Sequence, residues 1–389
     1  MNIKEILLKT ANKIAVRKNT VLNFPLDKQK EYLNSLKEPK DDLERSYFQY
    51  KCQAYLDGNL LRVVLNIIFF PLSIFMLVKY GNKKYLKMTN ASLCKKAVFI
   101  NDEIPENVLP NSLYKEFDEI LIYNKDENYL SKNDLLFIKK IIFRYPLSWH
   151  FIFKIIIKIS RYRALINKYN PSAIIVCNEY SFTSSVLTYF CNLNGIKHID
   201  VMHGEKLFYI RDSFFKYDRC YIWDEYYLKL FSLLRVPLTQ FFIEEPPSLI
   251  FKNDIVKEKI DYVFYLQAES NEELNVIFSI LAEIKNKNTV LVRMHPTYSN
   301  KNEIEKLSKK YDIPIEDNFI VGIEESVLRT KNVISLYSSV LNQAYHSGKN
   351  IIIDDLSRPK DFKKLKERGY IMLSVNHRLL SEIVEENKN

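Results

Sequence analysis

The sequence predicts an α/β fold with two Rossmann-like domains, preceded by a helical N-terminal segment. Short apolar, strand-like runs alternate with helix-length segments in two separate blocks of the chain, a pattern typical of parallel sheets joined by right-handed crossovers. A stretch with two prolines and mixed charge, residues 244–259, separates the blocks and has the character of a linker. We therefore expect a helical extension over residues 1–92, a first α/β domain over 93–245 and a second over 258–389.

The same patterns place the elements in order. Residues 1–21 mix charged and apolar side chains and predict an amphipathic helix. First-block strands are expected at Ala97–Ile100, Glu119–Tyr123, Ala173–Cys177, His198–Met202 and Arg219–Trp223, with helices at Asn133–Phe143, His150–Lys168 and Phe182–Leu193. Second-block strands are expected at Tyr262–Leu266, Thr289–Val292, Phe319–Val321, Asn332–Ser335, Asn350–Ile353 and Tyr370–Leu373, with helices beginning near Ser270, Lys301, Glu324, Ser338, Asp361 and Arg378.

The segment Leu60–Val78 approaches the length of a membrane span, which takes about 20 apolar residues. Arg62 and Asn66 interrupt one end of it, and Pro71 is expected to break it in the middle. Three interpretations are open: a spanning helix, an interfacial hairpin that faces the membrane, and a buried core helix, which the sequence favours. The aromatic, basic stretch Trp149–Arg163 is interpreted as a core helix whose Lys and Arg stems extend outward.

Composition narrows the class of protein. The 389 residues carry 57 Lys and Arg against 47 Asp and Glu, and the formal net charge of +10 suits nucleic acid, anionic lipid or a phosphorylated substrate. The sequence contains no helix-turn-helix, zinc-finger spacing or RNA-binding aromatic motif, so nucleic acid is the weakest of the three. Its five cysteines form no CxxC pair, which indicates reduced thiols in a cytoplasmic protein.

Three polar segments each follow a predicted strand: His203-Gly204-Glu205, Arg293-Met294-His295-Pro296 and Ser335-Leu336-Tyr337-Ser338-Ser339. In an open parallel sheet, the carboxyl ends of the strands line the ligand site. Imidazole, carboxylate, guanidinium and paired hydroxyl groups at such positions indicate an anionic ligand and a proton transfer. The sequence therefore predicts an enzyme.

The first polar segment supplies candidate bases. Gly204 allows the backbone to turn sharply and approach a ligand. Either the imidazole of His203 or the carboxylate of Glu205, if burial raises its pKa, can take a proton from an attacking hydroxyl. Asn178 and Glu179 follow another strand of the same block and are candidates for contacting the acceptor.

The second and third segments supply a candidate phosphate site. Arg293 and His295 stand two residues apart, so they share one face of an extended strand end. The guanidinium can hold a phosphate by a bidentate fork, and the imidazole can donate a proton as the phosphate leaves. Ser338 and Ser339 open a helix whose side chains and free N–H groups can bind the same anion.

Other residues at predicted strand ends extend the nucleotide side. Gln267 and Glu269 follow the first strand of the second block, where a donor phosphate or sugar would lie. Gly322 and Glu324 can frame a nucleotide base and its ribose. Because the sequence contains no acidic DxD cluster and no His/Cys ligand spacing, we expect no metal and no cofactor.

The serine-rich region also carries a family resemblance. Residues 332–355 (NVISLYSSVLNQAYHSGKNIIIDD) resemble the donor-binding half of GT-B glycosyltransferases. With the HG and RxHP segments, the region 172–355 resembles bacterial sialyltransferases and polysialyltransferases, and also the CDP-glycerol glycerophosphotransferases of teichoic-acid and capsule synthesis. The resemblance implies that His203 is a base and that His295 and the paired serines hold the phosphate of the leaving nucleotide.

Two departures from these groups concern the donor. Leu336 stands where the glycerophosphotransferases carry an aspartate, and His203 stands where the sialyltransferases carry an acidic base, for which Glu205 is a displaced candidate. Both groups release CMP, so the resemblance favours a cytidine-activated donor and leaves UDP- and GDP-sugars open.

The sequence thus predicts a metal-independent GT-B glycosyltransferase of bacterial capsule or lipopolysaccharide synthesis. It would move a sugar from a nucleotide-activated donor, preferably CMP-linked and of the sialic acid type, to a hydroxyl of a glycan or lipid-linked glycan. It would work peripherally on the inner face of the cytoplasmic membrane, in contact with anionic lipid. The alternatives are a CDP-glycerol-type glycerophosphotransferase, a sugar-nucleotide epimerase on the same scaffold, and a non-catalytic scaffold of an assembly complex.

Overall fold

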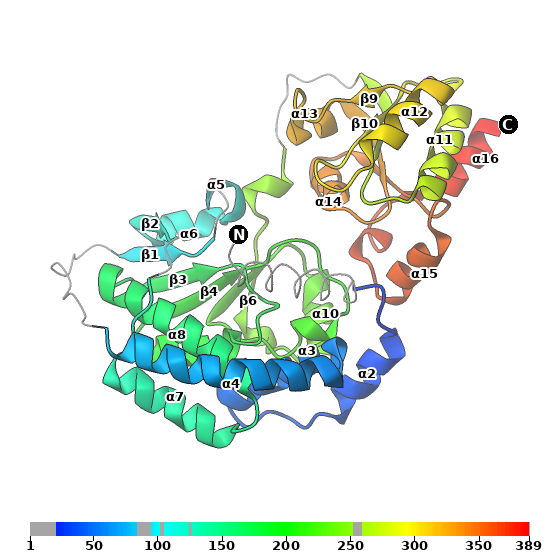
Figure 1. The fold of residues 1–389 in the computed structure, drawn as a ribbon. Helices are drawn as coiled ribbons and strands as arrows, with labels where there is room; N and C mark the ends of the chain where they lie inside the picture. The colour runs from blue at the N-terminus through cyan, green and yellow to red at the C-terminus, as the bar shows by residue number, and fades with distance from the viewer. Residues whose placement is uncertain (1–20, 84–94, 102–104, 124–126, 252–258, 389) are drawn as a thin grey trace. The chain divides into compact units, whose positions relative to one another are not determined.

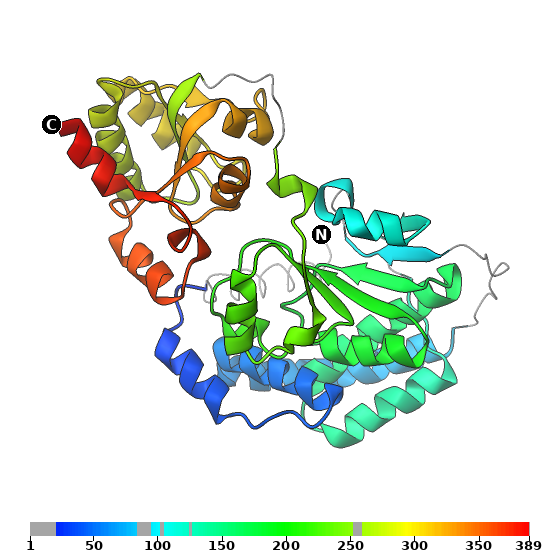
Figure 2. The same cartoon turned by 180° about the vertical axis from the view of Figure 1, so that it is seen from behind.

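A computed structural model describes residues 21–83, 95–101, 105–123, 127–251 and 259–388, which form two compact units (Figures 1 and 2). The first unit contains the chain up to His203 together with Phe208–Glu245. The second contains Gly204–Leu207 and the chain from Pro246 onward. Each unit is built on a six-stranded sheet whose neighbouring strands all pair in parallel. The predicted fold class, α/β with two Rossmann-like domains, is confirmed.

The first sheet has the strand order β2-β1-β3-β4-β5-β6. Its strands are β1 (Lys96–Phe99), β2 (Glu119–Ile122), β3 (Ala173–Val176), β4 (Lys197–Val201), β5 (Arg219–Ile222) and β6 (Phe241–Ile243). The first five coincide with predicted strands. All four residues of β3 are buried, as expected for a central parallel strand covered on both faces. The edge strand β6 was not predicted because it has only three residues, all apolar, and Phe242 and Ile243 are both exposed, so it shows no alternation.

Helices of the first unit that follow β1 are α5 (Pro105–Val108), α6 (Asn111–Glu116), α7 (Lys132–Arg144), α8 (Trp149–Tyr169), α9 (Ser184–Leu193) and α10 (Tyr226–Leu233). The start of α7 is fixed by a capping box: Ser131 Oγ accepts from the N–H of Asp134, and the carboxylate of Asp134 accepts from the N–H of Ser131. Short 3₁₀ turns lie at Ile210–Asp212 and Leu238–Gln240.

Three helices open the described part of the chain: α2 (Leu26–Ser35), α3 (Asp42–Asp57) and α4 (Asn59–Gly81). The carboxylate of Asp41 caps α3 by accepting from the N–H of Glu44 at 2.8 Å. Helix α3 packs on α9, and α4 packs on α8, so these helices are part of the first unit. The amphipathic helix predicted over residues 1–21 lies, apart from its last residue, outside the described residues.

The second sheet has the strand order β12-β11-β10-β7-β8-β9. Its strands are β7 (Ile260–Tyr265), β8 (Val290–Arg293), β9 (Ile315–Glu316), β10 (Thr330–Ser335), β11 (Asn350–Ile353) and β12 (Arg378–Leu379). The helices are α11 (Asn271–Lys285), α12 (Lys301–Tyr311), α13 (Ile323–Leu328), α14 (Ser339–His346), α15 (Pro359–Glu367) and α16 (Leu380–Lys388). All six begin within two residues of their predicted starts.

Two strands predicted in the second block are absent from the described structure, and shorter strands elsewhere take their places in the sheet. Phe319–Val321 forms a turn, in which the side chain of Phe319 is 89% exposed, and the edge strand is β9 instead. Tyr370, Ile371 and Met372 are buried, but Ile371–Leu373 forms a 3₁₀ turn, and β12 follows it. An apolar run of three or four residues fits a strand, a turn or a helix end equally well, so only packing distinguishes them.

The segment predicted as a buried core helix is neither buried nor broken. Helix α4 continues through Pro71, and only Ser73 and Tyr80 within it are buried. Pro71 donates no N–H, so the carbonyl four residues before it lacks its helical donor, yet the helix continues on both sides. The hydroxyl of Ser73 donates to the carbonyl of Phe69 at 2.6 Å within the same helix. The helix is long and apolar enough to cross a membrane, with a mean hydropathy of 2.3 over its most apolar window, of which 11% is buried. The expectation of a core helix was wrong.

Candidate functional site

The connectivity of the second sheet marks one ligand-binding position. The chain runs from β7 outward to β8 and β9, then returns to β10 and runs outward to β11 and β12. Strand order therefore reverses between β7 and β10, and ligands of open α/β sheets bind beside the carboxyl ends of the strands at such a point. Gln267 and Glu269 follow β7, His295 follows β8, and Ser338 and Ser339 follow β10. Because β8 and β10 flank β7, their carboxyl ends lie about 10 Å apart.

His295 is held in a defined orientation after β8. Its Nδ1 accepts from the backbone N–H groups of Thr297 at 3.1 Å and Tyr298 at 3.3 Å, and its ring stacks on the ring of Tyr298 with centroids 4.6 Å apart. Two donors at Nδ1 place the proton of the neutral imidazole on Nε2, which makes that nitrogen a hydrogen-bond donor. Desolvation lowers the pKa of His295 below its usual value and favours this neutral form.

The loops after β7 and β8 are tied to each other by Ser299, which the sequence analysis did not identify. Its hydroxyl accepts from the N–H of His295 at 2.8 Å and donates to the carbonyl of Gln267 at 3.2 Å. Both carboxylate oxygens of Glu269 accept from the N–H of Gln267, so Glu269 shapes its own loop, and burial raises its pKa. Ser299 lies in a turn-like polar stretch of the sequence, and nothing in that stretch predicts that its side chain joins two loops.

The paired serines have different positions. Ser338 is the N-cap of α14, and its hydroxyl accepts from the N–H of Val340 at 3.3 Å. Ser339 is the first helical residue and is exposed. One serine therefore serves the helix, and the other presents its hydroxyl beside the N-terminus of α14, where the helix dipole favours an anion.

The side chain of Arg293 has partners other than His295. It is buried, one guanidinium nitrogen pairs with the carboxylate of Glu316 on β9, and another donates to the carbonyl of Val321 at 2.9 Å. Glu316 also pairs with Arg329, so one buried carboxylate joins two guanidinium groups. In this arrangement Arg293 holds the edge of the sheet and the turn that follows it. The period-2 argument assumed that the strand extends to His295, but β8 ends at Arg293, so alternation along a strand does not relate the two side chains.

Gly322 and Glu324 lie at the start of α13. Gly322 is the N-cap of this six-residue helix and has an ordinary extended conformation, so glycine is not required there by its backbone angles. The side chain of Glu324 is exposed.

The first sheet also reverses its strand order, between β1 and β3. Asn178 and Glu179 directly follow β3, and His203 follows the neighbouring β4. The carboxylate of Glu179 accepts from the N–H of His203 at 3.3 Å, and the N–H of Asn178 donates to buried Asp200 at 2.8 Å. The predicted acceptor-side residues are thus brought together, with the His203 side chain exposed and Glu179 fully buried.

Glu205 differs from His203, although only Gly204 separates them. It groups with the second unit, where its carboxylate accepts from the side-chain amide of Asn342 at 3.1 Å. Desolvation raises the pKa of Glu205 well above its usual value, opposed by hydrogen bonds from Asn342 and Tyr370. Gly204 itself has a φ of 68°, in the left-handed region that favours glycine, which allows the sharp turn between the two side chains.

Within the described residues, no cluster of three or more His, Cys, Asp or Glu side chains could hold a metal ion. The cysteines in this part of the chain, Cys52, Cys177, Cys191 and Cys220, are buried and form no disulfide with one another.

Comparisons with known proteins describe the fold only. No family model and no curated protein matches the chain. Among solved structures, the wall teichoic acid polymerase TagF is similar at 12% identity and a TM-score of 0.42, over 88% of each chain. UDP-GlcNAc 2-epimerase from Methanocaldococcus jannaschii is similar at 12% identity and a TM-score of 0.39, over 73% of this chain and 94% of the epimerase. S. aureus TarM is similar at 11% identity and a TM-score of 0.32, over 56% of this chain, which spans about half (51%) of TarM. At such values the likeness assigns no activity and no residue role to this chain.

Proposed function

We propose that the protein is a transferase that moves a group from a nucleotide-activated donor to a glycan hydroxyl in the synthesis of a bacterial surface polymer. The observation that carries the proposal is the fixed orientation of His295, whose Nε2 is left as a donor at a strand end beside the reversal of strand order. A neutral imidazole donor and the N-terminus of α14 suit an anion such as a nucleotide phosphate.

On the donor side, His295, Ser338 and Ser339 bind the phosphate, and Gln267 lies on the loop between them. Their hydrogen bonds stabilise the negative charge that develops on the leaving nucleotide, so the chemistry requires no metal. Arg293 acts indirectly, by holding the sheet edge next to His295. Gly322 and Glu324 remain candidates for contacts with the nucleoside.

On the acceptor side, His203 is the preferred base. Its side chain is exposed, and its backbone is fixed by Glu179. The buried carboxyl group of Glu205 favours its protonated form and so is poorly suited to accept a proton. Asn178 and Glu179 are the candidates for binding the acceptor.

The proposed site binds a nucleotide phosphate, and the sequence motifs, rather than the site, favour a particular transferred group. A sialic-acid-type sugar linked to CMP is the donor that the motifs favour, and CDP-glycerol is the alternative. The same phosphate site serves both, and a UDP- or GDP-sugar as well. The protein is proposed to act from the cytoplasmic face of the membrane on a lipid-linked acceptor.

A panel of CMP, CDP, UDP and GDP tests the donor site by the shift in thermal midpoint of the full chain. A nucleotide at 100 times its Kd adds about 2.7 kcal/mol of stability. The favoured nucleotide then selects the donors for a transfer assay, among them CMP-sialic acid and CDP-glycerol. Extension of a glycan acceptor indicates a transferase, whereas release of an altered sugar with no extended acceptor indicates an epimerase. If no nucleotide shifts the midpoint, the proposal is wrong.

A further inference from the structure

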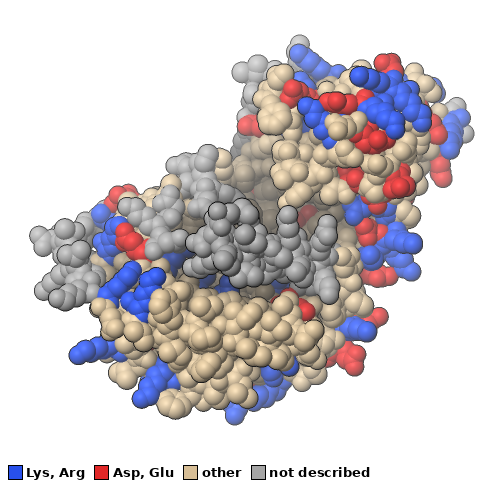
Figure 3. Space-filling view, in the orientation of Figure 1, with Lys and Arg blue, Asp and Glu red and all other residues tan. Residues whose placement is uncertain are grey.

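The first unit has an exposed apolar face, which we define by side chains of α4, of α7 and of the loop that joins α7 to α8. They are Leu60, Val63, Val64, Ile67, Ile68, Phe70, Leu72, Ile74, Phe75 and Val78 of α4, Leu136 and Phe143 of α7, and Leu147. Figure 3 shows a broad area without charge over these helices, with Lys and Arg at its edge. Soluble proteins rarely expose so many apolar side chains on neighbouring helices unless these meet a partner or a membrane.

Helix α4 lies along the protein rather than standing free of it. One stripe faces inward: Asn66, Phe69, Ser73 and Tyr80 recur at a spacing of three, four and seven residues. The side chain of Asn66 accepts from the N–H of His150, and the ring of Phe69 stacks on the rings of His150 and Phe153. With one stripe attached to α8 and the other exposed, the helix fits a membrane surface, into which only its outer side would enter.

The charges around the face select the kind of membrane. Helices α4, α7 and α8 together contain eleven Lys and Arg and one acidic residue, Asp134. Three of the eleven cations pair with carboxylates: Arg163 with Asp134, Arg144 with Asp41, and Lys168 with Glu127. The other eight have no acidic partner among the described residues. A cationic rim around an apolar face is complementary to a bilayer that contains anionic lipid.

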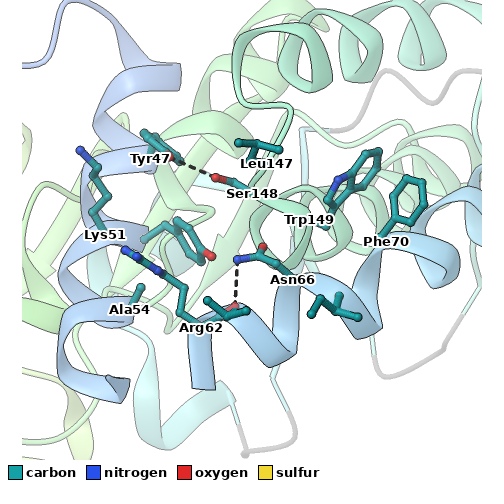
Figure 4. A pocket seen from close by; sticks show the side chains of 12 residues that line it. Tyr47, Lys51, Ala54, Arg62, Asn66, Phe70, Leu147, Ser148 and Trp149 are labelled. Atoms are coloured by element: carbon teal, nitrogen blue, oxygen red, sulfur yellow. Dashed lines mark hydrogen bonds between the residues drawn. The ribbon is translucent and has the colours of Figure 1, made fainter. Parts of the chain in front are cut away.

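A pocket of about 660 Å³ opens onto the same face (Figure 4). It lies between α3, α4 and the start of α8, and it shares Val63, Ile67, Phe70 and Leu147 with the apolar face. Its two ends differ in chemistry. Figure 4 shows the Lys51 and Arg62 side chains at one end and the rings of Trp149 and Phe70 at the other. Those two rings meet edge to face, with centroids 4.6 Å apart.

The cationic end has unused binding capacity. Neither Lys51 nor Arg62 forms an ion pair with an acidic group in the part of the chain that the structure describes. Tyr50, which also lines the pocket, is 3% exposed. Two cations at one end of an apolar pocket match a phosphate group joined to a hydrocarbon chain.

We propose that this pocket binds the phosphate of an anionic phospholipid while the apolar face lies in the headgroup region of the membrane. Lys51 and Arg62 hold the phosphate, and the acyl chain passes Phe70 and Trp149 toward the bilayer. The proposal names the lipid partner of the proposed transferase. The lipid site is tested by membrane binding alone, without a transfer assay, so this proposal can fail while the proposed function stands.

Co-sedimentation of the full chain with vesicles tests the site. We expect binding to vesicles of phosphatidylglycerol and phosphatidylcholine, and little binding to phosphatidylcholine alone. The double variant Lys51→Gln/Arg62→Gln should weaken binding at least 30-fold, which corresponds to about 2 kcal/mol at 1.4 kcal/mol per tenfold change. The control Lys309→Gln/Lys310→Gln removes the same charge from α12 of the second unit and should change binding less than threefold. Equal losses in the two variants would overturn the pocket, because net charge alone would then explain the binding.

Tryptophan fluorescence locates the contact, because the chain has two tryptophans and Trp223 is buried. Phospholipid brominated on its acyl chain should quench the fluorescence of Trp223→Phe, in which Trp149 is the emitter, and should leave that of Trp149→Phe nearly unchanged. Quenching in neither variant would place the membrane elsewhere and overturn the proposal. Glycerol 3-phosphate tests whether the pocket binds a soluble phosphate ester instead of a phospholipid. If it releases the protein from vesicles at micromolar concentration, the lipid assignment is wrong.

Discussion

Replacing His295 by asparagine distinguishes the roles of its two ring nitrogens, Nδ1 and Nε2. The side-chain oxygen of asparagine can take the place of Nδ1 and accept from the N–H groups of Thr297 and Tyr298, whereas nothing takes the place of the Nε2 donor. We therefore expect His295→Asn to keep the turn after β8, with the free energy of unfolding changed by less than about 1 kcal/mol. If Nε2 binds a nucleotide phosphate, the variant loses a hydrogen bond to a charged group.

The size of that loss follows from the type of bond. A hydrogen bond to a charged group contributes about 1.5–3 kcal/mol, so the Kd of the favoured nucleotide should rise about 10- to 150-fold. Turnover should fall further, about 100- to 1000-fold, if the same donor stabilises charge on the leaving phosphate. Isothermal titration with the nucleotide, urea unfolding and a transfer assay measure the three quantities.

The matched variant is His295→Gln. Its amide nitrogen can reach the place of Nε2, but it offers no acceptor at the place of Nδ1, so it should bind nucleotide better than His295→Asn while being the less stable of the two. If His295→Asn binds nucleotide as tightly as the parent protein, His295 serves only the turn, and the phosphate site proposed here is refuted.

Three further predictions concern stability and binding. Glu316→Gln should cost about 3–5 kcal/mol in urea unfolding, because it leaves the buried guanidinium groups of Arg293 and Arg329 without their carboxylate; a loss below 1 kcal/mol would show that the network is not stabilising. Acid should destabilise the first unit, because desolvation lowers the pKa of buried His198 to about 3. Below pH 6.5 the unfolded chain therefore binds a proton that the folded chain excludes, and the free energy of unfolding should fall by about 2 kcal/mol between pH 8 and pH 5. The pH dependence should be weaker in His198→Gln, and an unchanged slope would contradict the assignment. Ser338→Ala should cost about 0.5–2 kcal/mol through the lost N-cap, whereas Ser338→Asp should keep the cap and weaken nucleotide binding by repulsion; nucleotide binding that is unchanged in Ser338→Asp would place the anion elsewhere.

Much of the fold follows from local pattern. The strand β3 is a continuous apolar run, and the capping boxes at Ser131 and Ser270 mark the starts of α7 and α11, so these elements could be placed from the sequence. The alternation of strands and helices also fixed the class of fold, because crossovers between parallel strands require it. The positions of His203 and His295 after their strands follow from the same alternation.

The environment of each side chain depended on contacts between distant residues. The pairing of Arg293 with Glu316 spans 23 residues, and the hydrogen bond from Asn342 to Glu205 spans 137. Spacing along the chain cannot predict such partners, and so the sequence grouped Arg293 with His295, and Glu205 with His203, on the basis of neighbouring position alone.

Helix α4 shows most clearly which properties follow from local sequence and which depend on distant contacts. Its sequence determined that it is helical and apolar, and the inward stripe of Asn66, Phe69 and Ser73 is visible in its spacing once the partner is known. Whether the opposite side is buried depended on what packs there, and the tertiary structure left it exposed. Hydrophobicity measures the free energy gained when a side chain leaves water, but it does not say whether protein or lipid replaces the water.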